Sequence, residues 1–208
     1  MSIVKLNNQG VKNATAFGSI TGLGSMIFIK KLTASSSATL SFVDGSSSVV
    51  LDNTYKEYLF TFNNMHPASE NPNFAFNLSA DSGSNYNVSK TTTYFRTQHG
   101  ESGSGAEIGY ETGIDLANGT GIQKISKEAG NDSDQGVSGY FHLFNPSSTT
   151  FAKHFICQTN NNFKYSEPYA YSNYVAGYAN TTSAVDAIQF SFSSGNIDSG
   201  DICLYGIA

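Results

Sequence analysis

The sequence contains no tryptophan, only two cysteines and four prolines, and only 13% of its 208 residues are charged. Coiled coils and helical bundles need Ala, Glu, Lys, Leu and Arg in bulk, so this composition argues against both. Without tryptophan the chain lacks the largest aromatic ring that could form the floor of a sugar cleft, which argues against a glycoside hydrolase. The length is typical of one β-rich domain, since such domains often run to about 200–250 residues.

Positive charge is also scarce. The 11 Lys and Arg residues are scattered, Lys30 and Lys31 are the only adjacent pair, and the formal net charge is −5. Neutralising several phosphates at once needs clustered cations, so we expect no nucleic-acid partner. No apolar run approaches the roughly 18 residues that cross a bilayer, and the first residues lack the apolar stretch of a signal peptide. We therefore expect no membrane insertion and no export by a signal peptide.

What is abundant is polar and uncharged: Ser, Thr and Asn make up 66 of the 208 residues, and Phe and Tyr supply the aromatic content of 13%. Short runs alternate between apolar and polar residues, as in 55–63, where Tyr58, Phe60 and Phe62 face one way. This period of two is typical of a sheet with one buried face. Turn residues separate nine such runs, which predicts an all-β, antiparallel two-sheet sandwich that is jelly-roll-like. The predicted strands are 26–33, 38–43, 55–63, 73–79, 93–98, 138–145, 151–157, 184–192 and 201–207.

Three stretches depart from this pattern. Residues 1–25 form an extended N-terminal arm in this interpretation, and residues 26–208 form a single sandwich domain. Within that domain, 100–136 is rich in Gly, Ser, Glu and Asp and is predicted to be a long loop excursion with a small strand or helical turn near 108–116. The stretch 160–178 is rich in tyrosine and shows no clean alternation.

No motif in the chain predicts catalysis. The Gly- and Ser-rich run at 100–105 lacks the spacing and the strand–turn–helix context of a nucleophile elbow. The run Asn131–Gly136 resembles half of a calcium loop, but the later bidentate Glu is missing, which favours a solvated loop. We predict no enzyme activity, no cofactor and no metal site. Cys157 and Cys203 lie in strand-like runs, where free thiols are favoured over a disulfide.

The tyrosine-rich stretch is the strongest candidate for a ligand site. A tyrosine offers a flat apolar face and a hydroxyl, which suits stacking on a sugar or contact with a protein. The alternative, which the composition favours, is that some of these rings fill the core and others contact a neighbouring subunit. The candidate residues are Tyr165, Tyr169, Tyr171, Tyr174 and Tyr178.

Several runs resemble a family of marine tailed-bacteriophage (cyanophage-like) virion proteins. They are SGNIDSGDICLYGI at 194–207 with VDAIQF at 185–190, TYKEYLFTFNN at 54–64, LSADSGSNY at 78–86 and KLNNQGVK at 5–12. The resemblance implies a non-enzymatic structural component of the virion, a capsid decoration or part of a collar or tail fibre, made in the host bacterial cytoplasm. It brings no catalytic residues with it.

The expected partners follow from this resemblance and from the surface composition. We expect contacts with other virion proteins of the capsid or tail, through hydrogen bonds and shape rather than charge, and a homo-oligomer, most simply a trimer. The apolar residues of the N-terminal arm, namely Ile3, Val4, Leu6 and Val11, are predicted to dock on a neighbouring virion protein. The alternative function is a receptor-binding adhesin that recognises a host surface glycan with many weak sites.

Overall fold

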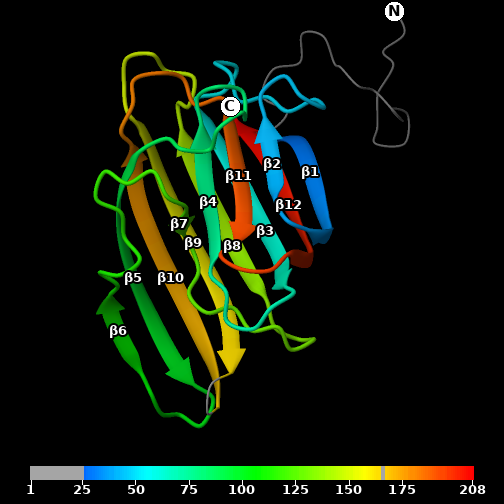
Figure 1. The fold of residues 1–208 in the computed structure, drawn as a ribbon, viewed down its shortest axis with the longest axis vertical. Coiled ribbons are helices and arrows are strands. Elements are labelled where there is room, and N and C mark those ends of the chain that lie inside the picture. The colour runs from blue at the N-terminus through cyan, green and yellow to red at the C-terminus, as the bar shows by residue number, and fades with distance from the viewer. Residues whose placement is uncertain (1–25, 165–166) are drawn as a thin grey trace, which may run out of the picture.

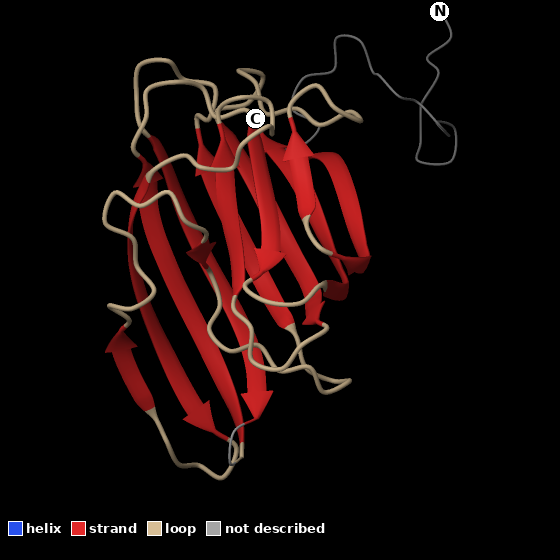
Figure 2. Cartoon of the chain, viewed as in Figure 1, coloured by secondary structure: helices blue, strands red, loops and turns tan. Residues whose placement is uncertain are grey.

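The structure is a computed structural model, and it describes residues 26–164 and 167–208. Over these residues the chain forms twelve strands and no helix, and the strands make two antiparallel sheets that pack together (Figures 1 and 2). Accordingly, no helix of the described chain is long and apolar enough to cross a membrane.

The larger sheet has eight strands and the smaller has four. In spatial order the larger sheet contains β1 (Met26–Ser37), β12 (Ile197–Ile207), β3 (Glu57–Pro67), β8 (Val137–Phe144), β9 (Lys153–Lys164), β10 (Pro168–Ala179), β5 (Lys90–Gly100) and β6 (Glu107–Tyr110). The smaller sheet contains β2 (Leu40–Val43), β11 (Ala187–Phe192), β4 (Phe74–Ser79) and β7 (Gln123–Lys124). Figure 1 shows that β9, β10 and β5 extend well beyond the smaller sheet.

The connectivity is that of a jelly roll. Strands β1 to β4 alternate between the two sheets, and β7, β8, β11 and β12 return beside them, so that β1 pairs with β12, β2 with β11, β3 with β8 and β4 with β7. Such pairing of first with last and second with second-last is the double Greek key of a jelly roll. The remaining strands, β5, β6, β9 and β10, widen the larger sheet. The predicted two-sheet, jelly-roll-like sandwich is confirmed.

Phenylalanine dominates the core between the sheets. Phe190 on β11 lies at its centre, with ring centroids 5.1 to 6.4 Å from those of Phe42, Phe60, Phe62, Phe74 and Phe141. Most of these contacts are edge-to-face, the arrangement that aromatic quadrupoles favour. The alternation predicted in 55–63 is confirmed, because Tyr58, Phe60 and Phe62 are buried and their neighbours are not.

The stretches 160–178 and 100–136 both contain strands. The tyrosine-rich stretch contains the end of β9 and most of β10, which pair with each other, and β10 also pairs with β5. The sequence of β10 shows no alternation of apolar and polar residues, because tyrosine occurs on both faces of the strand. The excursion at 100–136 contains β6, close to the small strand or helical turn predicted near 108–116, and also β7 of the smaller sheet. A side chain of β9 holds part of the remainder, since Asn161 Nδ2 donates to the carbonyl oxygen of Lys127 at 2.9 Å.

The cysteines are both free. Cys157 on β9 is buried, and Cys203 on β12 is half-buried. Burial raises the pKa of the Cys157 thiol well above its ordinary value, because the thiolate would be desolvated. The expectation of free thiols is confirmed.

Candidate functional site

The structure divides the predicted tyrosine site between the two faces of the larger sheet. Neighbouring side chains of a strand point to opposite faces, so Tyr169 and Tyr171 face the interior side, beside Phe163. Tyr174 and Tyr178 lie on the outer face, beside Phe95 and His154. These four residues therefore do not form one site. Tyr165 and the arm residues Ile3, Val4, Leu6 and Val11 lie outside the described residues.

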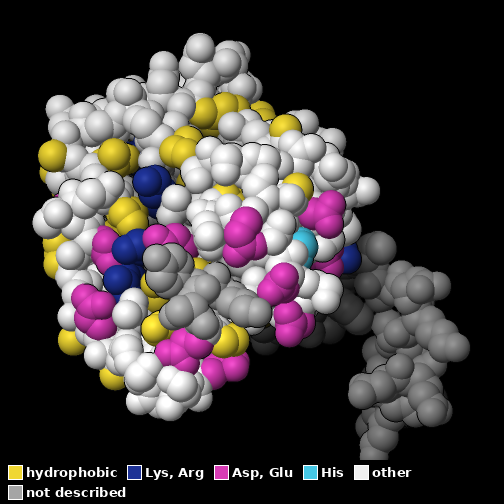
Figure 3. Space-filling view, turned by 60° about the horizontal axis from the view of Figure 1, so that its bottom comes forward, with side chains coloured by type: hydrophobic (Ala, Val, Ile, Leu, Met, Phe, Trp, Pro, Cys, Tyr) yellow, Lys and Arg dark blue, Asp and Glu magenta, His cyan; other side chains and the backbone are white. Residues whose placement is uncertain are grey.

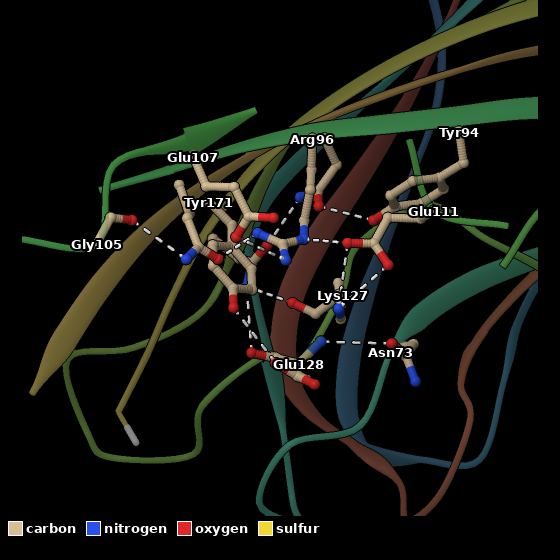
Figure 4. A network of polar contacts seen from close by, with 12 residues as sticks. Asn73, Tyr94, Arg96, Gly105, Glu107, Glu111, Lys127, Glu128 and Tyr171 are labelled. Carbon is tan, nitrogen blue, oxygen red and sulfur yellow. Dashed lines mark hydrogen bonds and ion pairs between the residues drawn. The ribbon is translucent and has the colours of Figure 1, made fainter. Parts of the chain in front are cut away.

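Tyr171 belongs to a charged network on the interior side, shown in Figure 4. The guanidinium of Arg96 lies 4.7 Å from the centroid of the Tyr171 ring, and the Tyr171 hydroxyl donates to Glu128 Oε2 at 3.4 Å. Burial, together with the nearby Glu128 carboxylate, raises the pKa of Tyr171 to about 12. Arg96 packs on the ring and Glu128 binds its hydroxyl, so both groups that a ligand would contact on Tyr171 are already in use within the protein.

Glu111 is the centre of the same network. Arg96 Nε donates to Glu111 Oε1, and Lys127 Nζ lies 3.2 Å from both carboxylate oxygens. Partial burial alone would raise the pKa of Glu111, but the hydrogen bonds from Arg96 and Lys127 outweigh it and hold the pKa below its usual value. The network ties residues 111 and 127, on either side of β7, to β5. Figure 3 shows the wider pattern: most Lys and Arg side chains in view have Asp or Glu side chains beside them.

The outer face of the larger sheet is different, because aromatic and aliphatic side chains occupy it. Strand pairing places Phe28, Tyr205, Leu59, His142 and Ile156 in one row across five strands. We call this surface the aromatic face; it comprises Phe28, Leu59, Phe95, Tyr140, His142, Phe144, Ile156, Tyr174, Tyr178 and Tyr205.

Side chains of the aromatic face pair across or along the strands. Phe95 and Tyr174 stack with centroids 4.8 Å apart, and Phe28 meets Tyr205 edge to face at 5.7 Å. Ile156 remains 51% exposed in the middle of the face. Two shallow hollows of about 380 and 210 Å³ lie on either side of it, because Ala176 beside it and Thr93 on the next strand are small. Extended apolar surface of this kind marks interaction sites.

The middle of the aromatic face carries no formal charge. Its two central rows, from Leu59 to Thr93 and from Thr61 to Phe95, contain no Lys, Arg, Asp or Glu. Charged groups lie at its margins, where the Glu57 carboxylate contacts the His142 ring and Lys31 Nζ lies 3.2 Å from Asp201 Oδ2. The hydrogen bond from Thr33, and then that from Lys31, lowers the pKa of Asp201. Electrostatic steering therefore contributes little to whatever binds here.

Sequence reasoning missed the aromatic face, although one signal was present. In HFICQ at 154–158 the apolar residues Phe155, Ile156 and Cys157 follow one another without alternation. A continuous apolar run indicates a strand with apolar residues on both faces. Phe155 and Cys157 are buried on the inner face, and Ile156 is the exposed member.

The described residues contain no cluster of three or more His, Cys, Asp or Glu side chains able to hold a metal ion. In the loop that resembles half of a calcium site, Asp132 and Asp134 are exposed in a turn. No family model matches the sequence, and no curated protein or solved structure matches it. The likeness to phage virion proteins therefore stays a prediction from the sequence.

Proposed function

We propose that this protein is a non-enzymatic structural component of a tailed-phage virion, and that it assembles with further copies of itself through the aromatic face. The observation that carries the proposal is the uncharged apolar surface around Ile156 on the outer face of the eight-stranded sheet. The virion context comes from the resemblance of its sequence runs to phage proteins.

The size of the aromatic face supports self-association. Neighbouring strands lie about 4.8 Å apart, and alternate residues of a strand lie about 6.8 Å apart. In the spatial order of the sheet, seven strands lie from β1 through β12, β3, β8, β9 and β10 to β5. Three rows of side chains across these strands cover roughly 700 Å². A standard protein interface uses about 800 Å² of each partner. The face is therefore large enough for a specific contact between two molecules.

The neutrality of the face favours a second copy as the occupant. In a two-fold contact the same surface of each copy faces the other, so a charged patch would repel itself. Here the central rows are uncharged, and Glu57 at the margin is already in contact with His142. A contact of this kind gives a two-fold dimer, whereas the trimer expected from the sequence would need the aromatic face to meet a different surface of the next copy, in the capsid or in an appendage.

The buried ionisable groups support a structural role, because their neighbours use them inside the sandwich. Lys90 is fully buried, and its Nζ donates to Asn77 Oδ1 and to the carbonyl oxygen of Val88 at 2.8 Å. Burial lowers the pKa of Lys90 to about 8. A lowered lysine pKa can mark a catalytic residue, but a buried structural network lowers the pKa in the same way. The hydrogen bonds of Lys90 within the core favour the structural explanation.

Immunogold labelling of intact particles with antibody against this chain tests the proposal. Gold over the capsid supports a decoration protein, and gold at the collar or tail supports an appendage protein. Particles without label would contradict the virion assignment. The alternative function, a receptor-binding adhesin for host glycan, is favoured by a groove of hydroxyl and amide side chains at one end of the same sheet. An adhesin would bind host cells as isolated protein and block infection, whereas a purely structural component would do neither.

A further inference from the structure

A polar groove of about 570 Å³ lies where β3, β12, β8 and β9 meet the turn at 132–136. Its volume falls within the range of small-molecule sites, about 300–1,000 Å³. In contrast to the aromatic face, its lining consists mainly of amide and hydroxyl side chains. This inference does not depend on assembly through the aromatic face.

The groove exists because two neighbouring strands bulge at the same place. The register of β3 against β8 shifts between Phe62 and Met65, and that of β12 against β3 shifts on both sides of Ser199. Asn64 has a φ of 49°, and Gly200, with a φ of 122°, approaches so closely that a Cβ would lie 2.6 Å from the carbonyl oxygen of Asn64. Bulges of this kind redirect side chains and often lie next to functional sites.

Two amide groups of the groove are oriented by their oxygen atoms. Asn162 Oδ1 accepts the backbone N–H of Gly136 at 3.1 Å, and Gln135 Oε1 accepts that of Asp132 at 3.2 Å. A backbone N–H can only donate, so the amide oxygen must face it. The amide of Gln135 occupies the space that a side chain at position 130 would fill, because a Cβ at Gly130 would collide with the Gln135 amide oxygen.

This orientation leaves the two NH₂ groups available. Neither Asn162 Nδ2 nor Gln135 Nε2 has an acceptor among the described residues, and both residues line the groove. The protein therefore holds two hydrogen-bond donors in fixed positions at the groove. Donors that are oriented in advance lose little entropy when a ligand binds.

The groove also offers an acceptor. Asp134 is exposed in the turn, and His66 Nε2 lies 3.2 Å from the carbonyl oxygen of Asp132, so it carries the hydrogen in that contact. His66 Nδ1 is buried and lies 3.8 Å from Asp198 Oδ2. The exposed Asp134 carboxylate is the acceptor that a ligand hydroxyl can reach.

We infer that this groove is a binding site for an uncharged saccharide, which receives hydrogen bonds from the amides of Asn162 and Gln135 and donates a hydrogen bond to the Asp134 carboxylate. The groove lining contains no lysine or arginine that would favour a phosphate or a sulfated sugar. Sugar hydroxyls both donate and accept, so they match the combination of the amide donors with the Asp134 carboxylate acceptor.

Titration of the ¹⁵N-labelled full chain tests the inference, with D-glucose, D-galactose, D-mannose and N-acetyl-D-glucosamine as separate probes in the millimolar range. Two-dimensional ¹H–¹⁵N NMR spectra show side-chain NH₂ signals directly. We expect at least one sugar to shift the NH₂ signals of Asn162 and Gln135 in a saturable way. No saturable shift with any sugar, or shifts centred on the aromatic face instead, would overturn the inference.

Isosteric variants make the test specific. Asn162→Asp and Gln135→Glu keep the accepting oxygen and replace the NH₂ group by a second oxygen, so each should weaken sugar binding at least tenfold. Asn53→Asp adds the same charge on an exposed loop away from the groove and should bind like the wild-type chain. Unchanged binding by Asn162→Asp, in a variant with wild-type thermal unfolding, would refute the assignment. Particle labelling is independent of this result, so the two proposals can fail separately.

Discussion

Phe95 on β5 and Tyr174 on β10 stack face to face on the outer side of the eight-stranded sheet, with centroids 4.8 Å apart and ring planes 6° from parallel. They are direct neighbours in the strand register, and Tyr110 of β6 follows Phe95 in the same row. Phe95 is 42% exposed. The two rings are therefore held in a stacked arrangement on a surface that stays open to solvent, by contact with each other and not by burial in the core.

The stacked pair should be measurable as a coupling energy. We expect Phe95→Ala and Tyr174→Ala each to destabilise the fold modestly, and the double variant to lose less than the sum by about 0.5–1.5 kcal/mol, the usual value for an aromatic pair. Urea unfolding of the four proteins gives this cycle. Strictly additive losses would mean that the rings do not interact in solution.

Phe190 should be among the most costly core positions, because five phenylalanine rings surround it. Phe190→Ala is expected to lower the free energy of unfolding by about 3–5 kcal/mol, through lost transfer energy and a residual cavity. Phe151→Ala, at a ring that is 66% exposed, is the matched control and should change stability by less than about 0.5 kcal/mol. Similar losses at the two positions would contradict the described core.

Glu111→Gln should loosen the excursion that contains β6 and β7. The change leaves Arg96, whose side chain is only 9% exposed, without its carboxylate, and we expect a loss of roughly 2–3 kcal/mol at pH 7. The exposed Glu107, 3.8 Å from Arg96, is the control, and Glu107→Gln should cost less than about 1 kcal/mol.

The effect of Glu111→Gln should depend on pH. Because the pKa of Glu111 in the fold lies below its ordinary 4.5, its pairing stabilises the protein fully above pH 4.5 and is lost as pH falls through the folded pKa. Urea unfolding of wild type and variant should therefore converge in acid. A difference that stays constant down to pH 2 would show that the carboxylate charge is not responsible.

Lys90 predicts a change at alkaline pH. Its pKa in the fold is about 8 against an ordinary 10.5, so between these values the unfolded chain binds the proton that the folded chain has released. Stability then rises with pH over this window. One pKa unit corresponds to about 1.36 kcal/mol, so the contribution of Lys90 should grow by roughly 2–3 kcal/mol from pH 8 to 10.5.

A comparison of two methionine variants isolates that contribution. Lys90→Met removes the titrating group, so wild type should gain stability relative to this variant as the pH is raised. Lys56→Met, at an exposed position, should keep the wild-type dependence. Measuring both against wild type also cancels the effect of the buried tyrosines, such as Tyr58, whose raised pKa acts in the opposite direction. Parallel curves for wild type and Lys90→Met would show that Lys90 is not buried as described.

Much of the fold could be predicted from the sequence, because the alternation that marks a strand, such as that of Tyr58, Phe60 and Phe62, lies within one short run of residues. The strand β10 could not, since Tyr171 and Tyr174 lie on opposite faces and erase the contrast between them. The interaction surface could not be predicted either. Ile156 and Phe95 share one hollow only because β9 and β5 both pair with β10, and that order is a property of the whole topology.

The saccharide groove is hidden in the sequence for a further reason. It depends on the bulges that place Asn64 and Ser199 at the groove, and on hydrogen bonds that orient Gln135 and Asn162. Asparagine and serine are common throughout this chain, so composition does not distinguish these positions from the rest.

The oligomeric state of an Ile156→Lys variant tests the central claim most directly. Light scattering coupled to size-exclusion chromatography, over a range of concentrations, should find a closed oligomer for the wild-type chain and a monomer for Ile156→Lys. Ile122→Lys introduces the same change at a residue that is 41% exposed and lies before β7 of the other sheet, and it should assemble like wild type. A monomeric wild-type chain, or an Ile156→Lys variant that assembles normally, would contradict assembly through the aromatic face.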